Sequence, residues 1–295
     1  MKKWRPILSI GILLLTIFVF ARYLVLNPEV VRQLRQVNPL YIFLIMGLYL
    51  GIIFSLTIVN TISVRLCGKK IGKKESFNLT STSSIANFFG PLQSGVGIRA
   101  VYFKTKLGIP IKQYGLASLY YYGMYAFLSG MFLLFGNPSL RLPLFICLLG
   151  GLIATIFYIR YKTNQAHIKN PHITIELLLK LFFTVLLQLS LITIIYFLQL
   201  QALGKSPDLS QVISYSGAAN FSLFVAITPG AIGIREAFLV FSQNLHHINR
   251  DLVVAANILD RGIYVLFLGL LFIWLVSTHA QIKIKSRQTE KTQQN

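Results

Sequence analysis

The chain has 295 residues and a formal net charge of +20, yet only 12% of its residues are charged and 55% are hydrophobic. A soluble domain carries about 25% charged residues, and a disordered basic protein is poor in Phe and Leu, so the composition excludes both classes. It predicts a chain solvated mostly by lipid, whose positive balance reflects topology and attraction to anionic lipid rather than nucleic-acid binding.

The first predicted element is the apolar run Ile7–Leu26, which follows Met-Lys-Lys-Trp-Arg. As a helix it would span about 30 Å, the thickness of the hydrocarbon core. A cleavable signal peptide, cut after Val19-Phe20-Ala21, is the alternative, but the apolar region of such peptides has only about 7–15 residues. We therefore predict a retained first span. Further apolar runs predict spans at Leu40–Leu66, Gln113–Phe135, Leu142–Ile159, Leu181–Leu200 and Leu252–Val276.

Two stretches, 76–99 and 210–235, do not fit the pattern of a span. Each mixes small, polar and aromatic residues, and each is interrupted by Pro and Gly. Irregular backbone at membrane depth is tolerated only inside the protein or against a water-filled cavity. Each stretch is therefore predicted to be a re-entrant broken helix that returns to the side from which it enters.

The distribution of Lys and Arg predicts that both termini are cytoplasmic. With the N-terminus inside and both broken stretches re-entrant, the inner segments hold 19 of the 28 basic residues and the outer segments hold five. This bias follows the positive-inside rule. We expect a multi-pass protein of the cell (cytoplasmic or inner) membrane, with 160–172 inside, 201–209 outside and 281–295 as a basic cytoplasmic tail.

The same topology predicts an inverted repeat. Residues 1–135 hold three spans and the first re-entrant stretch, and residues 136–280 hold three spans and the second. Because three is an odd number, the second unit is inverted relative to the first. The predicted fold is thus an all-α polytopic membrane protein with six spanning helices plus two re-entrant broken helices in an inverted repeat, as in many secondary transporters.

Each broken stretch ends in glycines followed by an arginine. The two motifs are Gly95-Val-Gly97-Ile-Arg99 and Gly230-Ala-Ile-Gly233-Ile-Arg235. Glycine permits close backbone approach, and the N–H groups of a helix start, with an Arg in its first turn, suit a phosphate. A tight turn whose Arg extends to the membrane interface is the alternative. Both interpretations stay open at this point.

The chain has only eight acidic residues, and the pairs Arg235-Glu236 and Asp260-Arg261 hold two of them. On a helix, Asn257 and Arg261 share a face with Asp260 on its flank, and we expect this face to point into the bundle because exposing it to lipid is costly. It would form a structural ion pair, Asp260 with Arg235 or Arg261 with Glu236. Alternatively, it would line a charged cavity for a lipid headgroup or a coupling proton.

The remaining polar residues predict no catalytic, cofactor or metal site. Cys67 and Cys147 form no CxxC, and the five histidines show no metal-binding spacing. No Ser-His-Asp arrangement, phosphate-binding loop or dinucleotide fingerprint is present, so we do not expect an enzyme. Other polar groups are predicted to be interface anchors or packing residues and an interfacial i,i+4 pair: Tyr120, Tyr121, Tyr122 and Tyr125, and Glu176 with Lys180.

At these motifs the sequence resembles the flippase-like integral membrane family typified by the transmembrane part of lysylphosphatidylglycerol synthase. Ala231 replaces the middle Gly of the family's Pro-Gly-Gly-x-Gly-x-Arg-Glu pattern, and Ser94-Gly95-Val96 stands where members often carry Gly-Gly-Glu. The matching residues are Asn87, Pro91, Gly95 and Gly97-Ile98-Arg99, and Pro229-Gly230-Ala231-Ile232-Gly233-Ile234-Arg235-Glu236.

The resemblance covers roughly residues 10–280 and implies a lipid-translocating or lipid-binding membrane domain. It does not imply lysyl transfer, because the family's soluble aminoacyl-transferase domain is absent from this sequence. We expect flipping of a phosphate-bearing lipid, such as a phospholipid or a polyprenyl-linked lipid. The expected headgroup-binding residues are Gly95, Gly97, Arg99, Gly230, Gly233 and Arg235, and those expected to supply cavity charge or coupling are Glu236, Asn257, Asp260 and Arg261.

Two other functions remain as alternatives. One is an intramembrane lipid-processing enzyme of the polyprenyl-diphosphate phosphatase type, which the scarcity of acids disfavours. The other is a non-transporting accessory subunit that holds a lipid for an enzyme. The expected partners are anionic or phosphate-bearing membrane lipids, an enzyme of envelope-lipid or glycolipid synthesis, and further copies of this chain, with no nucleic acid.

Overall fold

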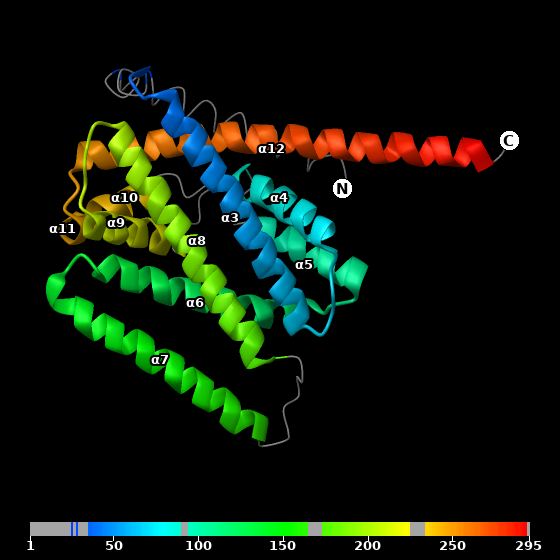
Figure 1. Cartoon of the computed structure of the whole chain (residues 1–295), viewed down its shortest axis with the longest axis horizontal. Helices are drawn as coiled ribbons and strands as arrows, with labels where there is room; N and C mark the ends of the chain where they lie inside the picture. Colours follow the sequence, from blue (N-terminus) through cyan, green and yellow to red (C-terminus); the bar gives the residue numbers. More distant parts are fainter. Residues whose placement is uncertain are drawn as a thin grey trace.

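The structure, a computed structural model, describes residues 35–89, 94–164, 173–224 and 234–293, and the single positions 25 and 28. Within these ranges the chain forms α-helices joined by turns, packed into one bundle (Figure 1). The helices are α3 (Pro39–Leu66), α4 (Lys73–Phe89), α5 (Ser94–Leu107), α6 (Ile111–Leu134), α7 (Pro138–Asn164), α8 (Ile175–Ala202), α9 (Leu209–Ser222), α10 (Ile234–Phe241), α11 (Gln243–His246) and α12 (Arg250–Gln293).

Three of the six predicted spans correspond to helices that are long and apolar enough to cross a membrane. They are α3, α8 and the Arg250–Thr278 part of α12. The predicted span 113–135 is helix α6, whose tyrosines, glycines and serines lower its mean hydropathy, and the predicted span 142–159 lies within α7. The predicted first span, Ile7–Leu26, lies almost entirely outside the described residues.

Helices α3 and α8 end with the same local structure. Each has 28 residues and is followed by a glycine in the left-handed region, Gly68 with φ of 73° and Gly204 with φ of 74°. Glycine adopts this conformation without the steric cost of a Cβ. The next residue, Lys69 or Lys205, donates its N–H to the carbonyl five residues earlier, at 3.1 Å in both cases. This hydrogen bond satisfies a carbonyl at the helix end, so both helices stop at equivalent points.

Each of the two interrupted stretches contains a pair of packed helices. The first stretch, 76–99, forms most of α4 and the start of α5, and the second, 210–235, forms α9 and the start of α10. The connections at 90–93 and 225–233 lie outside the described residues. Helix α4 packs on α5 and α9 packs on α10, so each stretch brings two helices to the centre of the bundle.

Helix contacts in the two halves of the chain correspond to one another. Helices α3 and α8 lie side by side through the bundle, and each also contacts α6 and α12 (Figure 1). Helix α3 packs against α4, as α8 packs against α9. Helix α6 packs against α9 of the other half, as α12 packs against α4.

The α6–α9 and α4–α12 contacts are built differently. Gly217 on α9 lies so close to α6 that a Cβ added there would be 2.1 Å from the backbone nitrogen of Leu133. Only glycine fits at this separation, and backbone therefore meets backbone. Between α4 and α12 the contact is aromatic, with the rings of Phe88 and Tyr264 arranged edge to face and their centroids 5.3 Å apart.

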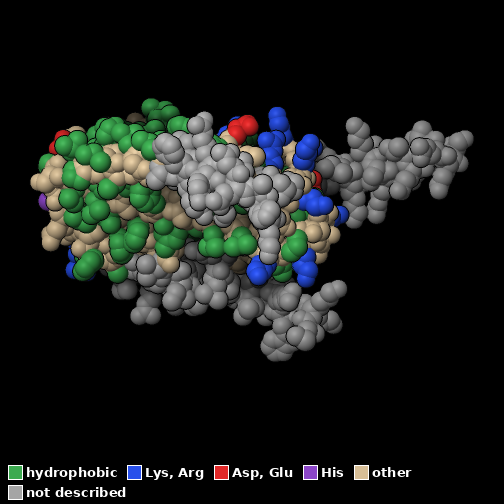
Figure 2. All heavy atoms as spheres, turned by 90° about the horizontal axis from the view of Figure 1, so that it is seen from below, with side chains coloured by type: hydrophobic (Ala, Val, Ile, Leu, Met, Phe, Trp, Pro, Cys, Tyr) green, Lys and Arg blue, Asp and Glu red, His purple; other side chains and the backbone are tan. Residues whose placement is uncertain are grey.

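The connections between helices gather at two ends of the bundle. The α3–α4 and α5–α6 connections and the C-terminal end of α12 lie toward one end in Figure 1, whereas the α6–α7 and α8–α9 connections and α11 lie toward the other. Figure 2 shows hydrophobic side chains over much of the surface and Lys and Arg gathered near the first end. The α3–α4 connection and the first turns of α4 and α6 contribute exposed lysines to that end: Lys69, Lys70, Lys73, Lys74 and Lys112.

Helix α12 continues far beyond its apolar part. It runs from Arg250 to Gln293 and projects from the bundle in Figure 1. The tail predicted at 281–295 is therefore helical as far as Gln293, which its composition permits because no Gly or Pro follows Gly269.

Candidate functional site

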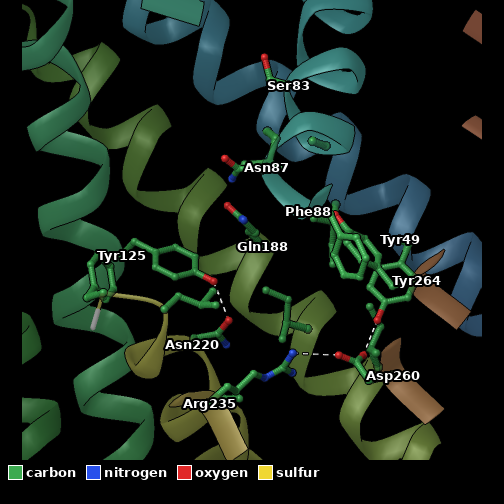
Figure 3. A pocket seen from close by; sticks show the side chains of 18 of the residues that line it. Tyr49, Ser83, Asn87, Phe88, Tyr125, Gln188, Asn220, Arg235, Asp260 and Tyr264 are labelled. Atoms are coloured by element: carbon green, nitrogen blue, oxygen red, sulfur yellow. Dashed lines mark hydrogen bonds and ion pairs between the residues drawn. The ribbon is translucent and has the colours of Figure 1, made fainter. Parts of the chain in front are cut away.

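A cavity of about 320 Å³ lies at the centre of the bundle, where residues of α3, α4, α5, α6, α8, α9, α10 and α12 meet (Figure 3). Four charged residues singled out from the sequence line it together: Arg99, Arg235, Asp260 and Arg261. Each of the four is no more than 8% exposed. The structure therefore brings side chains from both helix pairs and from α12 into one buried polar space.

Arg99 is held by a chain of neutral hydrogen-bonding groups. Its Nη1 donates to Oδ1 of Asn60 on α3 at 3.0 Å, and Nδ2 of Asn60 donates to the Thr80 hydroxyl on α4 at 2.7 Å. Thr80 in turn donates to the carbonyl of Ser76 at 2.7 Å. Because the Thr80 proton is used there, its oxygen must accept from Asn60, which leaves the Asn60 carbonyl oxygen facing Arg99. Arg99 makes no ion pair with any described residue.

The glycines before Arg99 lie inside α5 rather than ahead of it, because the helix begins at Ser94. A Cβ added to Gly95 would lie 2.2 Å from the Ser83 carbonyl oxygen on α4, so this glycine allows α4 and α5 to touch. The Gly95 N–H, assigned to a phosphate in the sequence interpretation, donates to Oδ1 of Asn87 at 3.0 Å. A Cβ added to Gly97, by contrast, would meet no atom within 4 Å.

Arg235 forms a buried ion pair on the opposite side of the cavity. Its Nη1 lies 3.0 Å from Oδ2 of Asp260, and both side chains are 10% exposed. Arg235 also donates to the Tyr196 hydroxyl. The other oxygen of Asp260 accepts from the Tyr49 hydroxyl and, at 2.6 Å, from Nε2 of Gln199. Of the two ion pairs left open by the sequence, the Asp260–Arg235 pair is therefore present.

The other residues predicted for the site lie beside the cavity or outside the described part of the chain. Asn257 is buried beside the cavity, where its Nδ2 donates to the Tyr215 hydroxyl at 3.3 Å, and it is not a lining residue. Glu236 follows Arg235 on α10, but its side chain is outside the described residues. Gly230 and Gly233 also lie outside the described residues.

A wall of neutral amides and tyrosines, which was not predicted from the sequence, completes the cavity. The Tyr121 hydroxyl donates to Oε1 of Gln188 at 3.2 Å, and the Tyr125 hydroxyl donates to Oδ1 of Asn220 at 2.6 Å. Both tyrosines were assigned to interface anchoring or packing. A detectable signal existed, since Gln188 lies in the middle of a predicted span and an amide there needs a buried partner.

A second buried polar group, His246, lies behind the Arg235 side of the cavity. Its Nδ1 accepts the N–H of Ile248 at 3.1 Å, and its Nε2 lies 2.9 Å from the Leu239 carbonyl oxygen. The ring is fully buried and meets the Tyr215 ring edge to face. Burial lowers the pKa of His246, so the imidazole is neutral with its proton on Nε2.

On the other helix pair, Tyr102 of α5 donates to the carboxylate of Glu75 on α4, and this hydrogen bond raises the pKa of Tyr102 to about 12. Tyr102 therefore stays protonated and joins the two helices at neutral pH.

Among the described residues, no group of three His, Cys, Asp or Glu side chains is placed to hold a metal ion.

Comparison with known proteins places this geometry in a family context. A family model described as the lysylphosphatidylglycerol synthase TM region matches residues 7–271. This range includes both helix pairs and all four charged lining residues. Comparison with curated proteins gives no match.

Proposed function

This chain belongs to the family of the lysylphosphatidylglycerol synthase transmembrane region, and we propose that it binds the headgroup of a phosphate-bearing lipid in the central cavity and moves that lipid across the membrane. Family membership and three helices of membrane-crossing character make it an integral membrane protein. The proposed cargo is a phospholipid or a polyprenyl-linked lipid of the cytoplasmic membrane. Translocation needs no covalent step, so we propose a transporter rather than an enzyme.

The observation that carries this proposal is the meeting of Arg99, Arg235, Asp260 and Arg261 in one cavity. Charged side chains inside a membrane protein are costly, and they face the bundle interior where they serve a pathway or a binding site. Guanidinium groups are the side chains best suited to bind phosphate, because their N–H groups match its oxygens in pairs. A buried space lined by three arginines supports binding of an anionic headgroup.

The rest of the lining supports an amphiphilic ligand. Aliphatic side chains from α3 and α8 face the same space as the charged groups: Ile52, Leu56, Ile192 and Ile195. Outward-facing residues of α3, among them Phe43, Phe54 and Ile58, are exposed on the bundle surface and suit contact with acyl chains. A lipid whose headgroup enters the cavity while its chains stay in the bilayer fits both surfaces.

Correspondence between the two halves supports an inverted repeat with alternating access. Counted back from the glycine that ends α3 or α8, Asn60 and Tyr196 occupy the same position, eight residues earlier. Asn60 contacts Arg99 and Tyr196 contacts Arg235, so equivalent residues serve equivalent arginines. With the matching helix contacts, this supports six spans and two re-entrant helix pairs whose halves rock about the cavity.

Single-cysteine labelling tests the topology. The lysine-rich end of the bundle supports a cytoplasmic location for the α3–α4 connection, and the opposite end then faces outward. In a background without Cys67 and Cys147, Lys205→Cys should react with an impermeant maleimide on intact cells, and Lys70→Cys only after permeabilisation. Removing Cys147 matters most because it is exposed, whereas burial raises the pKa of Cys67 to about 11. Labelling of both from the same side would contradict the inverted repeat.

Reconstitution tests transport itself. Purified protein in liposomes should speed the exchange of a fluorescent phospholipid between the two leaflets. The exchange is measured by quenching the outer-leaflet fluorescence with dithionite. Arg99→Ala should slow this exchange, and Arg65→Ala, an exposed arginine at the end of α3, is the matched control. Lipid that binds but does not move would identify an accessory subunit. A new lipid product on chromatography would identify an enzyme.

A further inference from the structure

We infer that the headgroup site has two parts. Arg99 binds the phosphate, and the amides of Asn87 and Gln188, with the tyrosines beside them, bind hydroxyl groups. The cargo is therefore a polyol or sugar phosphate lipid rather than an amine-bearing one. This inference rests on the proposed function, because it names the substrate class of the same cavity. The assignment follows from the charge balance, from the hydrogen-bonding state of each polar group and from the shape of the aromatic wall.

Arg99 has the charge available for a phosphate. Its partner Asn60 is neutral, and no carboxylate of a described residue forms an ion pair with it. The position of the guanidinium is fixed by the Asn60–Thr80 hydrogen bond, so the group is oriented before a ligand arrives. A phosphate bound at Arg99 therefore gains a charge-assisted hydrogen bond without first breaking an ion pair.

The Arg235 side is less suited to either a phosphate or an ammonium group. A phosphate there competes with Asp260, which already lies 3.0 Å from Arg235. A carboxylate is the strongest partner for an ammonium group, and Asp260 already accepts from Arg235, Tyr49 and Gln199. Among the described lining residues, three arginines accompany a single carboxylate, Asp260, which disfavours a cationic headgroup.

Between these charged groups the cavity offers donors and acceptors together. The amide oxygens of Asn87 and Gln188 accept from Gly95 and Tyr121, and no described residue accepts from their NH₂ groups. Figure 3 shows the two amides facing one another across the space. The hydroxyl of Tyr125 donates to Asn220 and keeps its lone pairs as acceptors. A bound phosphate needs only hydrogen-bond donors from the protein, and an ammonium group needs only acceptors. A hydroxyl group can use both.

Aromatic rings give this polar wall an apolar face. The ring centroids of Tyr121 and Tyr125 are 5.7 Å apart, and those of Tyr125 and Phe224 are 5.9 Å apart. A polyol chain or a sugar ring presents C–H groups as well as hydroxyls, so it packs on such rings while its hydroxyls reach the amides. The cavity volume of about 320 Å³ lies within the range of small-molecule sites and leaves room beyond a single phosphate.

Matched lipids test the substrate class. Phosphatidylinositol and phosphatidylserine carry the same net charge, but the first adds hydroxyls and the second an ammonium and a carboxylate, while phosphatidic acid carries the phosphate alone. Titrated into the full-length protein in detergent and followed by thermal shift, phosphatidylinositol should bind at least about fivefold more tightly than either. Equal or tighter binding of phosphatidylserine would overturn the inference.

Variants separate the two parts of the site. Gln188→Met should lower phosphatidylinositol affinity about fivefold and leave that for phosphatidic acid unchanged, whereas Arg99→Ala should weaken both lipids about tenfold or more. Thr193→Val, which removes a buried hydroxyl of α8 that bonds Ser216 outside the cavity, controls for loss of folding. If Gln188→Met fails to fold, Gln188→Asn measured against Thr193→Val applies the same test. Preference for phosphatidylinositol retained in the Gln188 variant would contradict the amide assignment.

Two further measurements distinguish the possible failures. Soluble inositol 1-phosphate should compete with phosphatidylinositol but stabilise the protein less. If inositol 1-phosphate stabilises the protein and phosphatidylinositol does not, the ligand is a soluble phosphate rather than a lipid. In liposomes, movement of phosphatidylinositol and phosphatidylserine at equal rates would defeat this inference while leaving the proposed transport intact. Selective binding of phosphatidylinositol without movement of any lipid would defeat the proposed transport and support the headgroup assignment.

Discussion

Arg99 and Arg235 each end a Gly-Ile-Arg sequence, and each contacts a residue at the same position of α3 or α8. Their surroundings nevertheless differ. Arg99 meets the neutral amide of Asn60, whereas Arg235 is also paired with Asp260 of α12. The repeated sequence thus determines where each guanidinium lies, and the neighbouring helix determines whether a carboxylate neutralises it. Equivalent positions in two halves of a chain need not have equivalent roles.

The largest effect should come from removing Asp260. Asp260→Ala leaves the buried Arg235 without its carboxylate, and breaking a buried ion pair costs about 3–5 kcal/mol. The melting temperature in detergent should fall sharply, and the double change Asp260→Ala with Arg235→Ala should recover much of the loss. A double variant as unstable as Asp260→Ala would show that the pair is not the source of the effect.

Variants of the two arginines should differ most in the rate of lipid transport. Arg99→Ala should slow lipid movement about tenfold or more, because a charge-assisted hydrogen bond to phosphate is lost, and should lower the melting temperature less than Asp260→Ala does. Arg99→Lys should restore only part of the rate, because an ammonium cannot bind phosphate bidentately. Liposome assays and thermal melting of the same preparations give both quantities. If Arg235→Lys slows transport as strongly while its melting temperature stays normal, the phosphate belongs at Arg235 as well.

Two glycines of α5 provide an internal control for the packing of the first helix pair. Gly95→Ala places a Cβ against the Ser83 backbone and should destabilise the protein by about 1–3 kcal/mol. Gly97→Ala meets no neighbouring atom and should stabilise α5 by about 0.5–1 kcal/mol through helix propensity. Thermal melting distinguishes the opposite signs, and a loss at Gly97 equal to that at Gly95 would contradict the close α4–α5 contact.

The smallest expected effect is a pH dependence confined to the Arg235 side. Burial lowers the pKa of His246, so the unfolded chain binds its proton at a higher pH than the folded protein does. The stabilising contribution is complete above the ordinary histidine pKa of about 6.5 and declines as the pH falls below it. His246→Gln should flatten the melting temperature between about pH 5 and 7. Tyr102 of the other helix pair does not titrate in this range, because its hydrogen bond to Glu75 raises its pKa to about 12. An unchanged slope in the variant would assign the pH dependence to another group.

The sequence predicted the charged part of the site because charge is rare in this chain. With only eight acidic residues, the proximity of Asp260 to Arg261 and the repeated Gly-Ile-Arg motif pointed to the bundle interior, and the family assignment from the same motifs is confirmed over residues 7–271. Three predicted spans match apolar helices of sufficient length. Which carboxylate pairs with which arginine depends on the angle between α10 and α12, and no local pattern encodes that angle.

The neutral part of the site was missed for a different physical reason. Tyr121 and Tyr125 lie in an apolar helix where tyrosine is equally expected at a lipid interface or in a packed core, so residue type alone does not distinguish a cavity wall. Gln188 and Asn60 are stronger signals, because an amide inside an apolar span needs a partner. Their partners come from α6 and α5, and only the packed bundle brings these helices together.

The two contacts that join the halves also differ in stiffness. Where Gly217 lets α9 meet the backbone of α6, sliding drives atoms already in contact into overlap, so this contact resists shear. Where Phe88 and Tyr264 join α4 to α12, rotation about side-chain bonds can absorb a small displacement. The two halves correspond in their helix contacts, but these contacts differ mechanically: the α6–α9 contact is rigid, whereas the α4–α12 contact can yield to a small displacement.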